Sequence, residues 1–113
     1  MPYTEPYEAL DEKTRNISRA ITSLKEEIEA VNWYNQRVNT TADPELKAIM
    51  AHNRDEEIEH AAMTIEWLRR NMDVWDKELR TYLFTTGSIT ALEDGEGTEK
   101  PTATAALGIG SLK

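Results

Sequence analysis

Residues 21–38 of this chain read ITSLKEEIEAVNWYNQRV. Apolar residues recur every seven positions through this stretch and before it, at Leu10, Ile17, Leu24, Val31 and Val38. Ile21 and Ile28 fill the same stripe at the spacing of helix neighbours. The pattern predicts one helix, from about Glu8 to Val38, with an apolar seam that packs against other helices.

A second helix is predicted after a short polar break. Asp43 suits the N-cap position and Pro44 suits the first helical position. The apolar stripe of this helix, which extends to about Asn71, consists of Leu46, Met50, Ala61, Thr64 and Leu68. Because the connection is short, we expect an antiparallel hairpin.

The remainder of the chain divides into a short helix and a tail. Asp73 is predicted to cap a third helix, which carries Val74, Trp75, Leu79, Tyr82 and Leu83. We expect a helical domain over residues 1–92, then a flexible linker over 93–106, which lacks apolar periodicity. Residues 107–113, LGIGSLK, become apolar again and form a separate terminal peptide.

Composition supports an all-α protein and narrows its function. The chain has 113 residues, enough for one domain, and four of its five glycines lie in the last twenty positions. The absence of cysteine excludes disulfides, thiolate metal sites and cysteine nucleophiles. A net charge of −8 argues against binding to nucleic acid or an anionic membrane. The start has no secretory pattern, so we expect a cytoplasmic protein.

Packing considerations predict a dimer. Two long helices with wide apolar stripes cannot bury them against each other alone. The simplest closed arrangement is a two-fold dimer in which two hairpins form a four-helix bundle.

Three polar residues interrupt or border the apolar stripes. Glu27 lies at the edge of the first stripe, Glu57 near the centre of the second, and His60 one turn further on. A buried carboxylate is costly unless it is paired, protonated or bound to metal. A di-iron bundle takes a glutamate from each of two helices and a Glu-x-x-His pair from each of the other two. Each chain therefore supplies half of a di-iron centre, which the dimer would complete.

Simpler interpretations of these residues stay open. An isolated Glu-x-x-His is common in acidic helices, and residues 56–59 also suit a solvated face paired with Arg54. Tyr34, one heptad after Glu27, either forms a hydrogen bond beside the metal centre or fills space at the seam.

Two more polar clusters lie away from the stripes. Glu26, Glu29 and Trp33 fall within about 60° of one another on the first helix. His52, Glu56 and Glu59 form a similar row on the second helix and are candidates for a secondary site. Ordinary solvent-facing charge explains both clusters; the functional alternative is that they gather divalent cations and pass them inward.

These segments resemble the encapsulated ferritins. The similarity is carried by residues 26–34 (EEIEAVNWY), 52–63 (HNRDEEIEHAAM) and 66–71 (EWLRRN). The closing LGIGSL of residues 107–112 resembles the encapsulation peptides that dock cargo inside encapsulin shells. The resemblance covers nearly the whole chain, except the N-terminus and the linker.

The resemblance implies a ferroxidase that oxidises Fe(II) for storage inside an encapsulin nanocompartment. The residues that match the family's iron ligands are Glu27, Glu57 and His60. Those that match the site where metal enters are Glu26, Glu29 and Trp33. Tyr34 would lie beside the di-iron centre. The resemblance also implies a homodecamer, a ring of five dimers without a mineral cavity, so that the encapsulin shell would store the product.

Three other functions remain as alternatives. A di-iron oxidase or peroxide scavenger would act on something besides iron. A metal buffer would bind Fe(II) without accelerating its oxidation. A purely structural hairpin oligomer would carry these acidic residues only as a solvated face.

Overall fold

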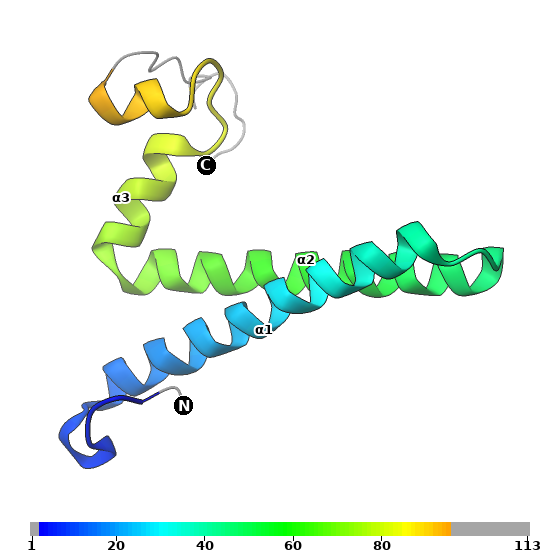
Figure 1. The fold of residues 1–113 in the computed structure, drawn as a ribbon. Coiled ribbons are helices and arrows are strands. Elements are labelled where there is room, and N and C mark those ends of the chain that lie inside the picture. Colours follow the sequence, from blue (N-terminus) through cyan, green and yellow to red (C-terminus); the bar gives the residue numbers. More distant parts are fainter. Residues whose placement is uncertain (1–2, 96–113) are drawn as a thin grey trace. The chain divides into compact units, whose positions relative to one another are not determined.

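The computed structural model describes residues 3–95, and every regular element in that range is helical. Helix α1 (Glu12–Thr40) and helix α2 (Pro44–Asn71) pack together as an antiparallel hairpin joined by residues 41–43 (Figure 1). A shorter helix, α3 (Asp73–Tyr82), follows. The prediction of an all-α chain with a two-helix hairpin and a short third helix is confirmed. The chain divides into two compact units between Asn71 and Met72.

Helix α1 begins later than predicted. Residues Tyr7–Ala9 form a separate 3₁₀ turn, η1, and the chain is extended at Leu10 and Asp11. The Asp11 carboxylate accepts a hydrogen bond of 2.8 Å from the backbone N–H of Thr14, which makes Asp11 the N-cap. The predicted start at Glu8 is therefore wrong, because a capped start at Glu12 replaces it. The helix also continues two residues beyond the predicted end, to Thr40.

The start of helix α2 agrees with the sequence prediction. The Asp43 carboxylate accepts a 2.8 Å hydrogen bond from the backbone N–H of Leu46, and Pro44 occupies the first helical position. Asp43 thus stabilises the turn that reverses the chain direction.

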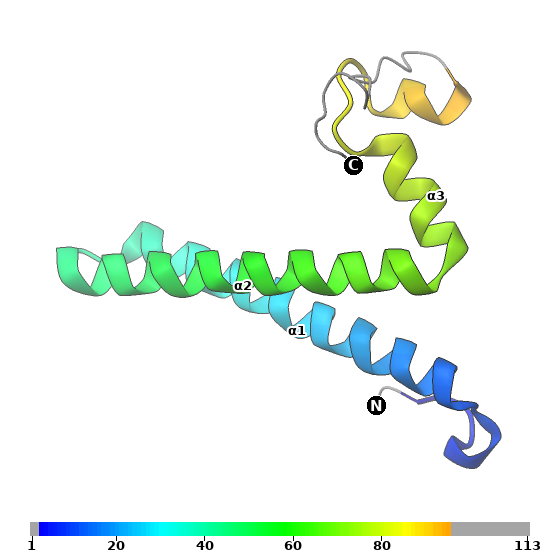
Figure 2. The same cartoon turned by 180° about the vertical axis from the view of Figure 1, so that it is seen from behind.

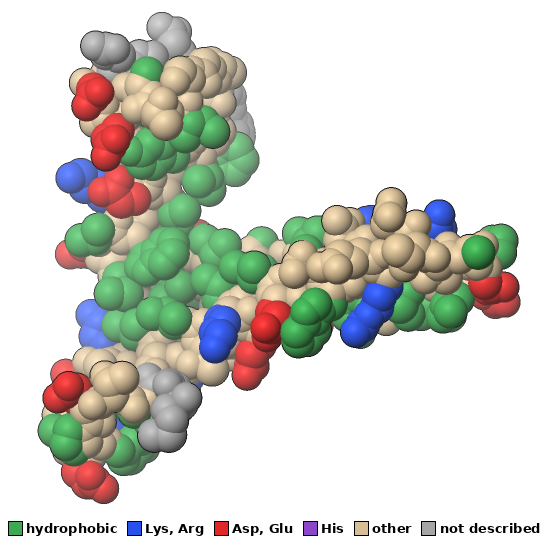
Figure 3. Space-filling view, viewed as in Figure 1, with side chains coloured by type: hydrophobic (Ala, Val, Ile, Leu, Met, Phe, Trp, Pro, Cys, Tyr) green, Lys and Arg blue, Asp and Glu red, His purple; other side chains and the backbone are tan. Residues whose placement is uncertain are grey.

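The hairpin has a small core and a large exposed apolar surface. Leu24 on α1 and Ala61 and Leu68 on α2 are buried, with Leu68 completely so. The large apolar side chains of this unit that stay exposed are Tyr7, Ile21, Ile28, Trp33, Leu46, Ile49, Ile58, Met63 and Trp67. Figure 3 shows apolar side chains open to view along the hairpin, beside charged ones. Figures 1 and 2 show that α1 and α2 cross and diverge toward the start of α1.

The second unit contains α3 and a five-residue 3₁₀ helix, η2 (Thr90–Asp94). Met72 occupies the N-cap position of α3 without a capping side-chain hydrogen bond, and its carbonyl accepts the first bond of the helix from the N–H of Asp76 at 3.2 Å. The predicted cap at Asp73 is therefore wrong by one residue. Leu92 in η2 is only 4% exposed. The predicted linker begins at residue 93, whereas η2 extends to Asp94. The rest of that linker and the terminal peptide 107–113 lie outside the described residues.

Within residues 3–95, no helix is both long enough and apolar enough to cross a membrane.

Candidate metal centre

The structure places the predicted metal ligands partly buried on the two long helices. Glu27 lies on α1, and Glu57 and His60 lie one turn apart on α2. All three are intermediate in exposure, with 29% of the Glu57 side chain and 43% of the His60 side chain accessible. They are therefore partly withdrawn from water in a single chain, while their outer sides stay open to a partner.

His60 lies between two carboxylates. Its Nδ1 is 3.9 Å from Oε1 of Glu57, and its Nε2 is 3.8 Å from Oε1 of Glu56. Two atoms at 3.9 Å are close enough to share one divalent ion, because bonds from nitrogen and oxygen ligands to such ions are about 2.1 Å long. The spacing predicted for the Glu57-x-x-His60 pair thus produces a pair of donors that face each other.

Glu27 is connected to the same part of α2 through a residue whose role was not predicted. The Thr64 hydroxyl lies 3.1 Å from Oε1 of Glu27 and 3.1 Å from the backbone carbonyl of His60. Thr64 was expected only as a member of the apolar stripe. Its position one turn after His60, as a polar residue in that stripe, was the available signal.

Tyr34 lies on α1 two turns after Glu27 and is half-buried. The Arg37 guanidinium lies over its ring, 5.2 Å from the ring centroid, within the range of a cation–π contact. Among residues 3–95, no hydrogen bond joins Tyr34 to Glu27, Glu57 or His60, so its place beside a metal centre remains a prediction.

The residues of the two outer clusters are exposed. This holds for Glu26, Glu29 and Trp33 on α1 and for His52, Glu56 and Glu59 on α2. The structure connects one cluster to the inner residues: Glu56 lies 3.8 Å from Nε2 of His52 and also 3.8 Å from Nε2 of His60. Glu56 is therefore within reach of both the surface and the predicted ligand His60.

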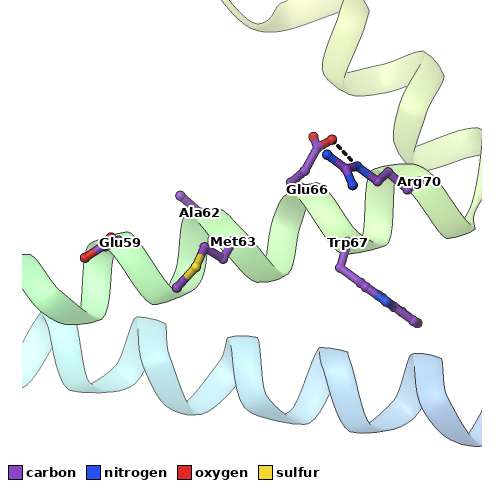
Figure 4. A pocket seen from close by; sticks show the side chains of 6 residues that line it. All are labelled: Glu59, Ala62, Met63, Glu66, Trp67 and Arg70. Carbon is purple, nitrogen blue, oxygen red and sulfur yellow. Dashed lines mark hydrogen bonds and ion pairs between the residues drawn. The ribbon is translucent and has the colours of Figure 1, made fainter.

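An open groove runs beside Glu27. It has a volume of about 370 Å³ and is lined by Arg19, Ala20, Ser23, Glu27, Met63, Thr64 and Trp67. Met63 and Trp67 also line a second hollow, of about 450 Å³, with Glu59, Ala62, Glu66 and Arg70. Figure 4 shows Met63 and Trp67 directed toward α1, and Glu66 bonded to Arg70. The apolar side chains of Met63 and Trp67 thus line the groove beside Glu27, together with polar and charged ones.

The donor set suits a hard or borderline divalent metal. Carboxylate oxygens and imidazole nitrogens are ligands that iron, zinc and manganese accept. In the described part of a single chain, no three His, Asp or Glu side chains come close enough together to hold an ion. The expectation of half a centre per chain stays a prediction that requires a second copy to test.

Comparison with known proteins shows the family of the chain. A family model described as EncFtn-like matches residues 2–86. An encapsulated ferritin-like protein of Rhodospirillum rubrum is 59% identical over 120 aligned residues, which cover 96% of this chain and 86% of that protein. A ferritin-like protein of Thermotoga maritima is 61% identical over 92 residues, covering 81% of each chain.

More distant and structural relatives extend the comparison. The encapsulin nanocompartment cargo protein EncC of Myxococcus xanthus is 34% identical over 74 residues, covering 62% of this chain and 57% of that protein. A crystal structure of a protein from Nitrosomonas europaea superposes with a TM-score of 0.76 at 60% identity, covering 79% of this chain and 99% of that one.

The fold and these relatives define a ferritin-like helical-hairpin protein. The chain belongs to the EncFtn-like family. The resemblance to encapsulated ferritins stated from the sequence is thereby confirmed.

Proposed function

We propose that this protein is a ferroxidase, which oxidises Fe(II) with dioxygen at a centre completed by a second copy of the chain. The observation that carries the proposal is the connection of Glu27 on α1 to the backbone of His60 on α2, through the hydroxyl of Thr64. This brings the lone in-stripe carboxylate of α1 to the turn of α2 that holds the Glu57–His60 pair. It is the ligand combination that one half of a di-iron bundle requires.

The chemistry follows from the ligand types. Iron is the substrate, and each Fe(II) ion gives up one electron. Two such ions supply the two electrons that, with two protons, reduce dioxygen to hydrogen peroxide. Carboxylate oxygens are hard, anionic ligands that stabilise Fe(III) more than Fe(II), so Glu27 and Glu57 favour oxidation. His60 supplies a neutral nitrogen ligand in its unprotonated form.

A second copy of the chain would complete the ligand set and cover apolar surface. Ile49, Met63 and Trp67 lie on the same side of α2 as His60 and are exposed. Packing this side against its equivalent in another hairpin would bury these side chains and place two copies of each ligand about one axis. The centre would then hold two iron ions between four glutamates and two histidines.

The exposed clusters fit a role in collecting cations. Glu26, Glu29 and Trp33 on α1 would form the outer site where metal enters. His52, Glu56 and Glu59 would form a secondary site, where other divalent cations can also bind. Glu56 would pass ions inward, because it approaches both His52 and His60.

Packaging of the protein is proposed from its relatives. One is named an encapsulated ferritin-like protein and another an encapsulin nanocompartment cargo protein. We propose that residues 107–113 bind an encapsulin shell, and that a decamer of five dimers works inside that compartment. Deleting residues 107–113 should abolish loading into co-expressed shells while leaving iron oxidation intact; loading that survives the deletion would contradict this part.

The main experiment compares an inner with an outer carboxylate on the same helix. Fe(II) is added to anaerobically purified protein, and oxygen consumption and ferric absorbance are followed for the parent, Glu57→Ala and Glu45→Ala, whose parent side chain is exposed and outside the proposed clusters. We expect rapid oxidation by the parent and Glu45→Ala and a large loss in Glu57→Ala, at matched oligomeric state. Background rates in the parent, with Fe(II) still bound, would favour a metal buffer. Equally rapid Fe(II) oxidation by the parent and both variants would show that the reaction does not depend on Glu57.

A further inference from the structure

Thr64 makes a contact that the packing of the hairpin does not require. Its hydroxyl lies 3.1 Å from Oε1 of Glu27, which is 37 residues away in the sequence and on the other helix. The contact is partly buried, so it is shielded from competition with water more than the surface hydrogen bonds are. It joins α1 and α2 at the level of the predicted metal ligands.

The same hydroxyl also faces an acceptor on its own helix. The His60 carbonyl lies 3.1 Å away, in the ordinary back-bonding geometry of threonine within a helix. A hydroxyl carries a single hydrogen, and an ionised carboxylate is a stronger acceptor than a peptide carbonyl. The hydrogen is therefore donated preferentially to Glu27, and the His60 carbonyl is the alternative acceptor.

This hydrogen bond restricts the Glu27 carboxylate. With Oε1 occupied by Thr64, the lone pairs of Oε2 remain for a metal ion. Glutamate has three rotatable side-chain bonds, and fixing them before the metal arrives reduces the entropy lost on binding. Hydrogen-bond partners of metal ligands orient them in this way and commonly contribute 10- to 100-fold in affinity.

We propose that Thr64 is a positioning residue that holds the Glu27 carboxylate ready for metal. The inference rests on the proposed function, because it assumes that Glu27 is a ligand. Thr64 itself binds no metal in this proposal; it acts through Glu27. The competing explanation is that Thr64 only bonds to the His60 carbonyl and fills space.

The test is an anaerobic titration of the full chain with Co(II), followed by its visible absorption spectrum. Thr64→Val removes the hydroxyl while keeping the shape of the side chain, and Thr64→Ser keeps the hydroxyl. We expect Thr64→Val to weaken Co(II) binding by about 10- to 100-fold and to change the absorption spectrum, and Thr64→Ser to bind as the parent does. A spectrum and affinity unchanged in Thr64→Val would overturn the proposal.

Thr81→Val is a matched control. The Thr81 hydroxyl donates to the carbonyl of Lys77 at 2.9 Å, so this variant removes a back-bond of the same kind on α3, a helix that carries no proposed ligand. It should bind Co(II) as the parent does. If Thr81→Val lost as much Co(II) affinity as Thr64→Val, removing any back-bond would be enough to weaken binding. That result would overturn the proposal that Thr64 positions Glu27. If Thr64→Val changes the oligomeric state, Thr64→Ala is measured in its place and interpreted by the same criteria.

Glu27→Gln separates this inference from the proposed function. If Glu27→Gln weakens Co(II) binding but Thr64→Val does not, the centre stands and the role of Thr64 is refuted. If neither variant differs from the parent, Glu27 is not a ligand and both proposals fail.

Discussion

Arg69 holds both carboxylate oxygens of Glu66, with its Nε and one Nη each donating a hydrogen bond of 2.8 Å. Arg70 adds a third hydrogen bond, from its Nε to Oε2 of Glu66, at 2.7 Å. Hydrogen bonds from Arg69, and next from Arg70, lower the pKa of Glu66 to about 2. This three-residue network organises the end of α2, on the hollow that Trp67 also lines.

The lowered pKa predicts a contribution to stability that depends on pH. A carboxylate whose pKa is lower in the folded state stabilises the fold above its unfolded pKa, near 4.5, and loses that effect as pH falls toward about 2. Because 42% of the Glu66 side chain is exposed, water screens the network. We expect Glu66→Gln to lower the free energy of unfolding by about 0.5–1 kcal/mol at pH 7.

Urea unfolding from pH 7 to pH 2 would check this prediction. The difference in free energy of unfolding between the parent and Glu66→Gln should shrink steadily as the pH falls from 4.5 toward 2. Glu78→Gln, at an exposed position on α3, serves as the control and should show no such trend. If the difference in free energy of unfolding stayed constant down to pH 2, the lowered pKa of Glu66 could not be its cause.

The cap at the start of α2 supports a second prediction. Asp43 accepts from the N–H of Leu46, so Asp43→Ala should destabilise the hairpin by about 1 kcal/mol. Asp43→Asn retains a side-chain oxygen that can cap the helix, and should keep most of the stability. Thermal unfolding followed by circular dichroism would measure both variants. Equal melting temperatures for the parent and Asp43→Ala would show that the cap does not matter.

The small core gives a third prediction. Leu68 is completely buried, and removing its side chain leaves a cavity that the two helices cannot easily fill. We expect Leu68→Ala to lower the free energy of unfolding by about 3 kcal/mol, against less than about 1 kcal/mol for Leu83→Ala, whose parent side chain is 44% exposed. Chemical denaturation at fixed protein concentration would measure the free energy of unfolding of both variants. Similar losses in the two would contradict the conclusion that Leu68 lies in the core.

The hairpin could be predicted because its signals are local. The seven-residue spacing around Leu24 and the stripe that ends at Leu68 belong to single helices, and both residues are buried. The Asp43-Pro44 pair likewise specifies a helix start within two positions. The start of α1 could not be predicted from periodicity, because Leu10 continues the apolar series although it lies outside the helix. The extended backbone at Leu10 and Asp11 and the hydrogen bond that Asp11 accepts from Thr14 mark the true start.

The candidate metal centre could be predicted only in part. The spacing of Glu57 and His60 on one helix follows from the sequence, and the structure places their side chains face to face. The contact of Thr64 with Glu27 depends on the register of two helices, which no local pattern specifies. The complete ligand set depends further on an interface with another chain, so single-chain periodicity predicts the ligand types without fixing their geometry.

The proposed half-centre on each chain predicts that metal binding and association of chains are linked. If an ion binds only where two chains meet, it stabilises the dimer by an amount that grows with its concentration. At one hundred times its dissociation constant, one ion contributes about 2.7 kcal/mol, which is about a 100-fold gain in dimer affinity. Adding Co(II) should therefore shift dilute protein toward dimers or larger assemblies, and chelation should reverse the shift.

His60 and His52 provide a matched pair to test this linkage. Both lie on α2 and both approach Glu56 at 3.8 Å, but the side chain of His52 is 71% exposed against 43% for His60. His60→Ala should remove most of the metal dependence of association, because it deletes a proposed ligand from each half of the proposed centre. His52→Ala should retain it, since a surface cluster does not need a second chain. Sedimentation velocity with and without Co(II) would measure the shift for each variant. If His60→Ala kept the full shift while His52→Ala lost it, the outer cluster would be the site through which metal joins the chains.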